Sequence, residues 1–360
     1  MVEFTYAPHI THKTDPLNQG TAPFLLRQHP ITPTGLFYIR NHGDMPDLHE
    51  RKYRLEIDGA VERQLFFSLD QLKRNFGKTL ITATLQCAGH RRQELHAHQP
   101  IPDEVIWGMD AVSTAVWGGV PLYQVLAAAG IKAEAKHVAF GGLDTVQRMG
   151  REFNYGSSIP LEKAVSPEVL LAYEMNGMPL AQEHGFPLRL IVPGYIGARS
   201  VKWLGKITLQ AQPSDNYFQS HAYKLFPPHI NRTTANWSAG IPLEEVFLNS
   251  AICSPQDSER LLDPYVLIQG YAFAGKNAIR KVEVSCDAGR SWEAAVITHQ
   301  PGEWAWTFWS LPCKLRPGTN ELIVRAFDDQ GNTQPERFES VWNFKGYANN
   351  AWHRIQVTVG

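Results

Sequence analysis

Cysteine is scarce in this 360-residue chain, which contains only Cys87, Cys253, Cys286 and Cys313. No two of them form a C-x-x-C pair, the spacing typical of zinc ribbons, many iron–sulfur sites and covalently attached c-type haem. Four cysteines are also too few for the disulfide framework of a small secreted scaffold. The cysteine content therefore argues against these classes.

Long apolar runs and a strong net charge are also lacking. No segment approaches the roughly 18–20 apolar residues of a membrane-spanning helix. The formal net charge is −1, so there is no overall positive field to attract nucleic acid. The first thirty residues lack a charged start followed by an apolar stretch, which predicts no signal peptide. We expect a protein that binds neither nucleic acid nor membrane and is cytoplasmic, or periplasmic if a leader has been trimmed.

The chain is long enough for two domains, which usually have about 100–200 residues each. Residues 1–35 contain five prolines and little periodicity, which predicts an irregular N-terminal arm. Residues 36–238 mix strand-like and helix-like segments without a regular βαβ rhythm, so we expect a mixed, α+β domain. Residues 239–360 alternate short strand-like runs with Gly, Asn or Asp turns, which predicts an immunoglobulin-like antiparallel β-sandwich.

Periodicity also predicts individual elements within the two domains. In the first domain, a helix is expected to start at Ser68 and another to span residues 121–129, ending at Gly130. Strands are expected at residues 53–57, 79–86, 188–193 and 201–209 of the first domain, and at 268–274, 278–286, 304–311, 320–328 and 352–359 of the second.

The most informative segment is Cys87 and the five residues after it, Ala, Gly, His, Arg and Arg. The predicted strand at residues 79–86 delivers this thiol, and nearby cations would favour the thiolate that ligates metals or attacks electrophiles. Gly89 would allow a tight turn. A structural alternative is a buried strand cysteine whose arginines pair with surface acids. Two adjacent guanidinium groups after a small turn favour a site that meets an anion.

Residues 85–92 resemble the signature of the sulfite oxidase family, which includes the molybdenum domain of eukaryotic nitrate reductase. The likeness runs from about residue 35 to the end of the chain. It is carried by residues 38–43, 155–161, 170–177, 184–194 and 197–204, and in the second half by residues 342–343 and 349–354. The resemblance implies a molybdopterin-binding domain followed by a dimerisation domain, and therefore a homodimer.

The resemblance also implies a role for each matching residue. Cys87 would be the protein ligand of molybdenum, as a soft thiolate suits a redox metal. The pterin and its phosphate would be held by His184, Arg189 and Lys202, with further contacts from Tyr38, Asn41, His42, Asp144, Arg199 and Ser200. The substrate pocket would contain Arg40, Arg92, Trp107, Tyr223 and, from the second domain, Lys345.

The activity implied is oxidation of sulfite to sulfate by oxygen-atom transfer. No haem or flavin site is predicted within the chain, so electrons would pass to an external acceptor such as a cytochrome or oxygen. Two positions depart from the family pattern: His90 replaces an asparagine, and Lys345 replaces an arginine. Lysine keeps the charge but loses forked hydrogen bonding.

Three other functions stay open at this point. The same cofactor could act on another small oxyanion or oxide, for example in nitrate or sulfoxide reduction. The sandwich could make the chain a non-catalytic binding or scaffold protein, which would need no molybdenum. Cys87 and His90 could form a cysteine hydrolase, although residues three apart near a turn rarely give nucleophile–base geometry.

Overall fold

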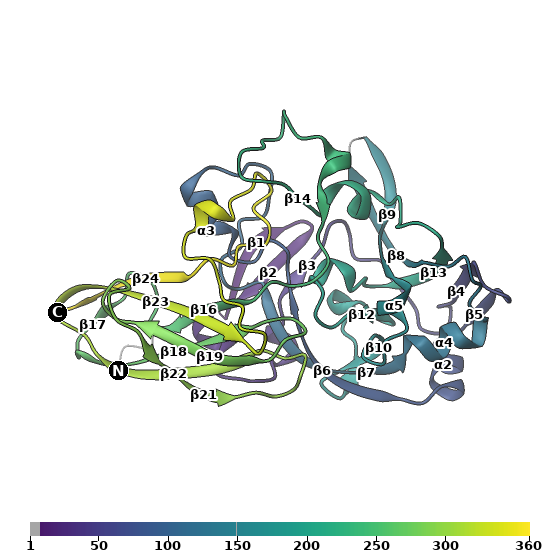
Figure 1. The fold of residues 1–360 in the computed structure, drawn as a ribbon. Helices are drawn as coiled ribbons and strands as arrows, with labels where there is room; N and C mark the ends of the chain where they lie inside the picture. Colours follow the sequence, from purple (N-terminus) through teal and green to yellow (C-terminus); the bar gives the residue numbers. More distant parts are fainter. Residues whose placement is uncertain (1–7, 149) are drawn as a thin grey trace.

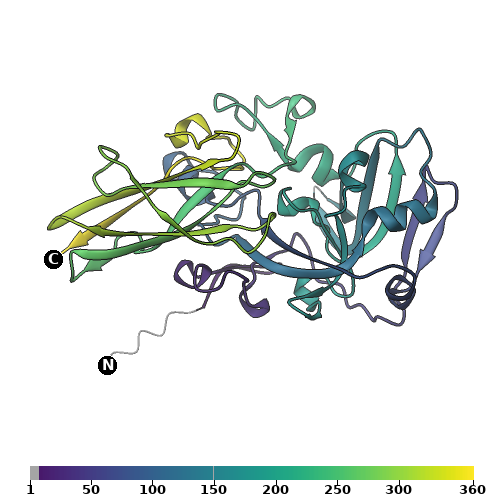
Figure 2. The same ribbon diagram turned by 60° about the horizontal axis from the view of Figure 1, so that its bottom comes forward.

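The computed structural model describes residues 8–148 and 150–360. Figure 1 shows two parts side by side: an elongated sandwich built from the C-terminal strands, and a mixed part that holds the strands and helices of residues 39–225. The turned view of Figure 2 shows the same division. This arrangement confirms the predicted α+β fold followed by a β-sandwich. No helix in the described ranges is long and apolar enough to cross a membrane.

Part of the N-terminal arm is regular, contrary to the expected irregularity of residues 1–35. Strands β1 (His9–Thr14) and β2 (Leu17–Thr21) form an antiparallel hairpin, and β2 pairs with β3 (Ile39–Arg40). The short helix α1 (Pro23–Leu26) and the 3-10 turn η1 (Thr34–Leu36) connect the hairpin to β3. The hairpin thus lies against the strand that carries Arg40. Pro8 precedes the first strand and Pro16 lies in the turn between the two strands, so neither interrupts the pairing.

One sheet of the first part brings Cys87 into the interior. Its members are antiparallel, in the order β11-β10-β7-β6, with β12 also paired to β10. Their bounds are β6 (Thr79–Gln86), β7 (Val112–Pro121), β10 (Leu170–Met175), β11 (Met178–Pro179) and β12 (Arg189–Ile191). Strand β6 is exposed at Thr79 and buried at its last four residues. The predicted strand at residues 79–86 is thus confirmed, and Cys87, which follows it, is placed in the core.

A second sheet has the order β5-β4-β13-β8-β9, in which β13 and β4 are parallel. Its strands are β4 (Leu55–Gly59), β5 (Leu65–Phe67), β8 (His137–Arg148), β9 (Arg151–Pro160) and β13 (Leu204–Gln210). Helices in this part are α2 (Leu69–Asn75), α3 (Arg92–His98), α4 (Leu122–Ala129) and α5 (Leu161–Ala164). Short turns η2 (Gln182–His184), η3 (Gly197–Arg199) and η4 (Phe218–Ala222) complete it.

The two predicted helices of this part are confirmed, with their end signals. Ser68 caps α2 in a reciprocal capping box with Gln71. Helix α4 buries its residues at spacings of three and four, and Gly130 ends it at φ 75° while donating its N–H to the last carbonyls. The pair β14 (Lys224–Leu225) and β15 (Ile241–Pro242), with η5 (Trp237–Ala239) between them, straddles the expected domain boundary at residues 238 and 239.

The second part is a sandwich of two sheets, ordered β16-β18-β22-β21 and β17-β24-β23-β19-β20. All pairings are antiparallel except the short β17–β24 pair, which is parallel. Residues such as Ile268, Trp309 and Val324 fill the space between the sheets. The strands are β16 (Asn249–Ser254), β17 (Arg260–Leu261), β18 (Tyr265–Phe273), β19 (Ile279–Ser285), β20 (Glu293–Ala294), β21 (Val296–His299), β22 (Thr307–Lys314), β23 (Gly318–Asp328) and β24 (His353–Val359), with η6 (Phe338–Ser340) before the last.

Candidate active site

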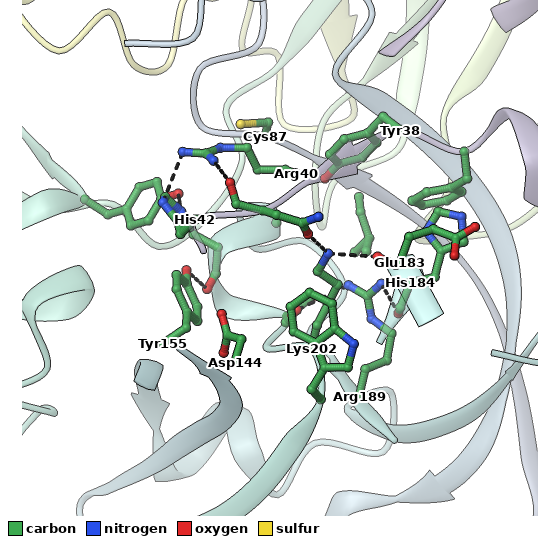
Figure 3. A pocket seen from close by; sticks show the side chains of 18 residues that line it. Tyr38, Arg40, His42, Cys87, Asp144, Tyr155, Glu183, His184, Arg189 and Lys202 are labelled. Atoms are coloured by element: carbon green, nitrogen blue, oxygen red, sulfur yellow. Dashed lines mark hydrogen bonds between the residues drawn. The ribbon is translucent and has the colours of Figure 1, made fainter. Parts of the chain in front are cut away.

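A cavity lies where β3, β6, β9, β12 and the segment before β13 meet. Its empty space is about 650 Å³ when the part that opens to solvent is included. Figure 3 shows Cys87 and Arg40 at one end of it and Arg189 and Lys202 at the other. Of the residues predicted for the site, Tyr38, Arg40, Asn41, His42, Cys87, Asp144, His184, Arg189, Ser200, Lys202 and Tyr223 line this cavity.

Cys87 is a buried free thiol whose backbone is fixed on both sides. Its N–H donates to the carbonyl of Ala111 at 3.0 Å, which continues the β6–β7 pairing by one residue. Its Sγ accepts the N–H of Gly89 at 3.5 Å. The chain makes a tight turn at residues 88–91, as predicted, in which the N–H of His90 donates to the carbonyl of Cys87 at 3.0 Å. A Cβ on Gly89 would lie 2.5 Å from the guanidinium carbon of Arg92. The thiol therefore faces the cavity from a rigid position.

Arg40, His42 and Tyr223 form a hydrogen-bonded chain beside the thiol. Nη2 of Arg40 lies 3.1 Å from Nδ1 of His42, and Nε2 of His42 lies 2.7 Å from Oη of Tyr223. A guanidinium can only donate, so Nδ1 is the acceptor. Burial and then the charge of Arg40 hold the pKa of His42 well below its ordinary value, so the ring is neutral. Nε2 therefore carries the proton and donates to Tyr223.

This chain leaves the hydroxyl proton of Tyr223 free to point elsewhere. Burial raises the pKa of Tyr223, so the phenol stays protonated at neutral pH. Because Oη accepts from His42, its own proton is available as a donor to a ligand in the cavity. The ring of Tyr223 is also stacked on Tyr347 of the second domain, with centroids 5.4 Å apart. The tyrosine is thus held in position by both domains.

Arg40 is oriented by the N-terminal hairpin. Its Nη1 donates to Oδ1 of Asn18 at 3.0 Å and also to the carbonyl of Asn41. The same Asn18 oxygen accepts the backbone N–H of Asn41 at 3.2 Å, and Asn18 is buried. With the bond to His42, three of the five N–H donors of Arg40 have partners in the described residues, which leaves two for a ligand.

The opposite end of the cavity holds Arg189 and Lys202. Nη1 and Nη2 of Arg189 donate to the carbonyls of His184 and Ser200, and Nζ of Lys202 donates to the carbonyl of Glu183 at 2.8 Å and to Oδ1 of Asn41. Burial lowers the pKa of Arg189 to about 10 and that of Lys202 well below its ordinary value. Within residues 8–148 and 150–360, neither cation has a carboxylate within ion-pair distance.

The chain turns sharply beside these cations at Gly185. Its φ is 104°, a left-handed conformation that strains any residue with a Cβ. A Cβ there would also lie 3.1 Å from the Cβ atoms of Arg189 and Lys202. Gly185 ends η2 directly after His184 and allows the backbone to pass close to both cations. Burial lowers the pKa of His184 to about 3, so it lines the cavity as a neutral ring.

Several buried polar atoms around the cavity have no hydrogen-bond partner among the described residues. They are Nδ2 of Asn41, Nε of Arg189, Nε and Nη1 of Arg199, and Oδ1 of Asp144. Arg199 lies just outside the cavity lining, and its Nη2 donates to the carbonyl of Leu243 at 2.6 Å. Burying unpaired donors is costly unless a ligand meets them. The donors and the unpaired cations fit an anionic, hydrogen-bonding group such as a phosphorylated pterin, with Cys87 available to a metal at the other end.

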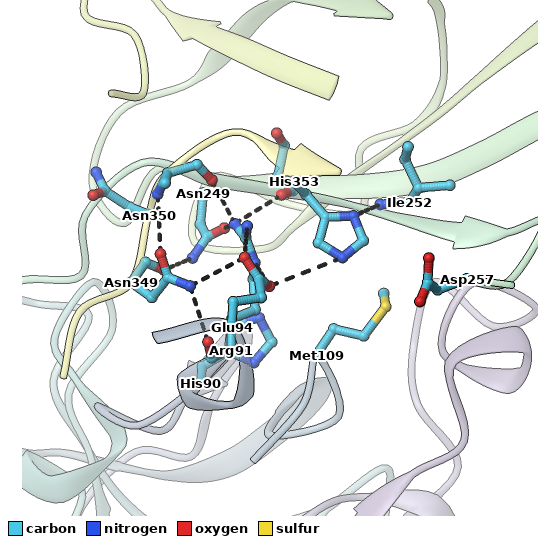
Figure 4. Close-up of polar contacts among 12 residues, drawn as sticks. His90, Arg91, Glu94, Met109, Asn249, Ile252, Asp257, Asn349, Asn350 and His353 are labelled. Carbon is cyan, nitrogen blue, oxygen red and sulfur yellow. Dashed lines mark hydrogen bonds and ion pairs between the residues drawn. The ribbon is translucent and has the colours of Figure 1, made fainter. Parts of the chain in front are cut away.

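The basic residues next to Cys87 do not surround the thiol as predicted. Nε and Nη2 of Arg91 donate to Glu94 at 2.7 and 2.6 Å, and its Nη1 donates to Asn249 and to the carbonyl of Ala351 in the second domain. Figure 4 shows this network, which Asn349 completes from the second domain. Arg91 therefore joins the two domains, and the cation that lines the cavity with Cys87 is Arg40 from β3.

His90 also points away from Cys87. Its Nε2 lies 2.8 Å from Oη of Tyr271, a residue of the sandwich, and burial holds its pKa well below the ordinary value. This orientation removes the nucleophile–base pair that a cysteine hydrolase would need.

Three residues predicted for the substrate pocket, Arg92, Trp107 and Lys345, do not line the cavity. Arg92 donates to the carbonyls of Lys345, Gly346 and Val105, so its guanidinium is largely used by the chain itself. Trp107 is fully buried, with its ring 4.5 Å from that of His12. Lys345 is hydrogen-bonded to Glu104.

The sequence interpretation missed several residues of the site. Asn18 and Tyr347 bind or stack on predicted residues, and Tyr155 and Glu183 line the cavity. Tyr155 could have been predicted, because it begins the string 155–161 that resembles the family. Glu183 directly precedes the string 184–194. Asn18 and Tyr347 come from segments far from Cys87 in the chain, and no local pattern marks them. Among the described residues, no group of three or more His, Cys, Asp or Glu side chains could hold a metal by itself.

Comparison with known proteins places the chain in one class, the molybdopterin-binding oxidoreductases. Residues 42–218 match the oxidoreductase molybdopterin-binding domain, and residues 242–360 match the Mo-co oxidoreductase dimerisation domain. The first match contains most of the cavity lining, including Cys87, Arg189 and Lys202.

The chain belongs to the sulfite oxidase family. It is 39% identical to sulfite oxidase of Arabidopsis thaliana, over 92% of this chain and 88% of that protein. It is 42% identical to mitochondrial sulfite oxidase of Macaca fascicularis over 96% of this chain, but it spans only 64% of the length of that relative. The crystal structure of the sulfane dehydrogenase SoxCD from Paracoccus pantotrophus superposes with a TM-score of 0.82 at 29% identity, covering 99% of this chain and 87% of that one.

Proposed function

We propose that this chain oxidises sulfite to sulfate with a molybdenum–molybdopterin cofactor whose protein ligand is Cys87. The observation that carries the proposal is the cavity itself: a buried thiol at one end and unpaired buried cations at the other. Sulfite oxidases from plants and animals among the relatives support sulfite as the substrate. The bound cofactor supplies a two-electron redox centre and a transferable oxygen, which the protein's own side chains do not offer.

Each end of the cavity has a separate task in this proposal. Arg189, Lys202 and the donors of Asn41 and Arg199 hold the phosphate and ring of the pterin through charge-assisted hydrogen bonds. Arg40 attracts the sulfite anion and orients it with its two free N–H groups. Tyr223, set by His42 as a donor, hydrogen-bonds to an oxygen at the reacting centre.

We extend the proposal to the partners of the chain. The match of residues 242–360 to a dimerisation domain supports a homodimer formed through the sandwich. Electrons leave to an external acceptor, such as a cytochrome or oxygen. Light scattering at working concentration tests the dimer, and a monomer mass would contradict it. Turnover with cytochrome c, compared with oxygen uptake without it, tests the acceptor.

The decisive experiment combines metal analysis with turnover. We expect about one molybdenum per chain, sulfite oxidation, and a Mo(V) electron paramagnetic resonance signal after reduction by sulfite. Cys87→Ser should lose sulfite oxidation and the signal while keeping the unfolding temperature of the parent, because the thiol has a single backbone N–H as partner. Turnover retained by this variant would exclude the ligand role. Protein without molybdenum after expression with cofactor supply would favour a scaffold.

Nitrate is the control substrate in the same assay. Reduction of nitrate by the molybdenum-loaded protein, without oxidation of sulfite, would assign the same cofactor to another oxyanion. The cavity geometry supports both small anions, and the names of the sulfite oxidase relatives favour sulfite.

A further inference from the structure

Glu104 lies between two of the cations that the sequence assigns to the substrate pocket. Its Oε1 accepts a hydrogen bond from Nζ of Lys345, and its Oε2 lies 3.7 Å from Nη2 of Arg92. The three side chains are largely buried, with exposed fractions of 12% for Glu104, 9% for Lys345 and 3% for Arg92. The carboxylate therefore meets both cations in the interior beside the cavity, and it bridges the two domains.

This ion-paired cluster adjoins the reacting end of the cavity through two tyrosines. The guanidinium of Arg92 lies 5.1 Å and Nζ of Lys345 lies 5.5 Å from the ring centre of Tyr347. The other neighbour of that ring is Tyr223, which lines the cavity. The charge of the cluster therefore contributes to the electrostatic potential beside Tyr223, because screening is weak in the protein interior. The net charge of the cluster is +1 with Glu104 ionised, and would be +2 without it.

We propose that Glu104 is a specificity-determining residue: an internal carboxylate that reduces the net positive charge of Lys345 and Arg92 and so weakens the binding of doubly charged oxyanions next to Tyr223. This inference rests on the proposed function and refines it. Arg40 becomes the main cation that meets the substrate. A dianionic product such as sulfate is held less tightly and is released more easily, at the cost of weaker capture of sulfite.

The ionisation of Glu104 is consistent with this role. Burial by itself raises the pKa of the carboxyl group, but Arg92 and Lys345 lower it below the ordinary value. The group is therefore charged at neutral pH, and the substitution Glu104→Gln removes a charge while keeping the shape and one hydrogen-bond acceptor.

The test measures sulfate binding to the cofactor-loaded protein by isothermal titration calorimetry with sodium sulfate. Glu104→Gln should bind sulfate at least about tenfold more tightly, since a charge close to a dianion in a weakly screened site has a large effect. The KM for sulfite should fall in the same variant, with no gain in kcat. Asp103→Asn is the matched control: it removes the same charge one residue earlier, from a side chain that is 73% exposed, and should change the affinity less than twofold.

Lys345→Gln gives an independent reading if Glu104→Gln does not fold. Loss of the lysine leaves the carboxylate less compensated, so sulfate should bind several-fold more weakly. Unchanged or weaker sulfate affinity in folded Glu104→Gln overturns the inference, as does unchanged affinity in Lys345→Gln. The proposed function fails in a different way, if the molybdenum-loaded parent protein does not oxidise sulfite. The calorimetric measurement with sulfate does not require turnover, so the two failures can be told apart.

Discussion

Two groups of buried cations lie within one fold but have different partners. Arg189 and Lys202, at the inner end of the cavity, have hydrogen bonds to carbonyl or amide oxygens and no ion pair within the described ranges. Arg91 and Lys345, where the domains meet, each contact a carboxylate, Glu94 or Glu104. Carbonyl groups from both domains satisfy further donors of Arg91 and Arg92.

The difference teaches which buried cations belong to a ligand and which belong to the fold. A buried charge with a carboxylate and several acceptors is compensated by the chain itself. Burial lowers the pKa of Arg189 and Lys202, and also that of the paired Lys345, so the missing counterion is what separates the two groups. A buried cation without a counterion gains the most when an anion binds. The cavity cations are therefore expected to contribute to cofactor affinity, and the interdomain cations to the free energy of unfolding.

The sharpest test of this comparison replaces one cation of each kind by methionine. In cofactor-free protein, Arg91→Met should lower the free energy of unfolding by about 3–5 kcal/mol, because Glu94 is left partly buried without its partner. Arg189→Met removes an uncompensated charge and should cost less than about 2 kcal/mol. Denaturant unfolding of both variants, followed by tryptophan fluorescence, measures the two losses.

The cofactor-loaded proteins provide the control. Cofactor binding stabilises the folded state by a free energy that rises with the logarithm of its affinity, so Arg189→Met should lose part of that stabilisation and retain less molybdenum. Arg91→Met should bind the cofactor normally once folded. Equal destabilisation of the two cofactor-free variants would contradict the distinction between the cavity cations and the interdomain cations.

Much of the site could be predicted from contiguous strings. Cys87 follows a strand that could be predicted because residues 79–86 are rich in Thr and Ile, and the structure confirms that strand as β6. Arg189 and Lys202 lie in strings that resemble the family, and both line the cavity. The organisation into an α+β domain and a sandwich could also be predicted, because strand spacing and turn residues change after about residue 240.

The partners of each cation could not be predicted, because they come from distant segments. Arg91 and Arg92 are adjacent and look alike in the sequence, yet one binds Glu94 and the other packs over Gly89 toward the second domain. The Lys345 partner Glu104 is 241 residues away. The regular hairpin of residues 9–21 was also missed, since its strands are polar and their burial depends on β3.

The interdomain network should be sensitive to acid through His353. Its Nδ1 accepts the N–H of Ile252 at 3.1 Å, and burial lowers its folded-state pKa to about 4. The unfolded chain binds this proton at about pH 6.5, so the stabilisation is complete above that pH and is lost as the pH falls towards 4. The linked change is about 3 kcal/mol. Unfolding free energies measured from pH 7 to 4 should fall less steeply for His353→Asn, which keeps an acceptor for Ile252.

Burial also lowers the pKa of His184, to about 3, and the pKa values of His42 and His90. The fall of the parent's unfolding free energy with falling pH is therefore a sum over these rings. The difference between parent and His353→Asn isolates one ring. Parallel pH profiles for the two proteins would show that folding does not lower the pKa of His353.

The cavity should show the opposite pH dependence through Asp144. Burial raises the pKa of this carboxyl group to about 6, although Lys202 acts to lower it. Between about pH 4 and 6 the unfolded chain loses the proton while the folded chain keeps it, so this contribution to stability falls as the pH rises and is fully lost above pH 6. Cofactor-free Asp144→Asn should therefore be about 2–3 kcal/mol more stable than the parent at pH 7 and equal to it near pH 4. A variant less stable than the parent at pH 7 would mean that Lys202 and Asp144 form a compensated pair, and the cavity would then resemble the interdomain network it is compared with.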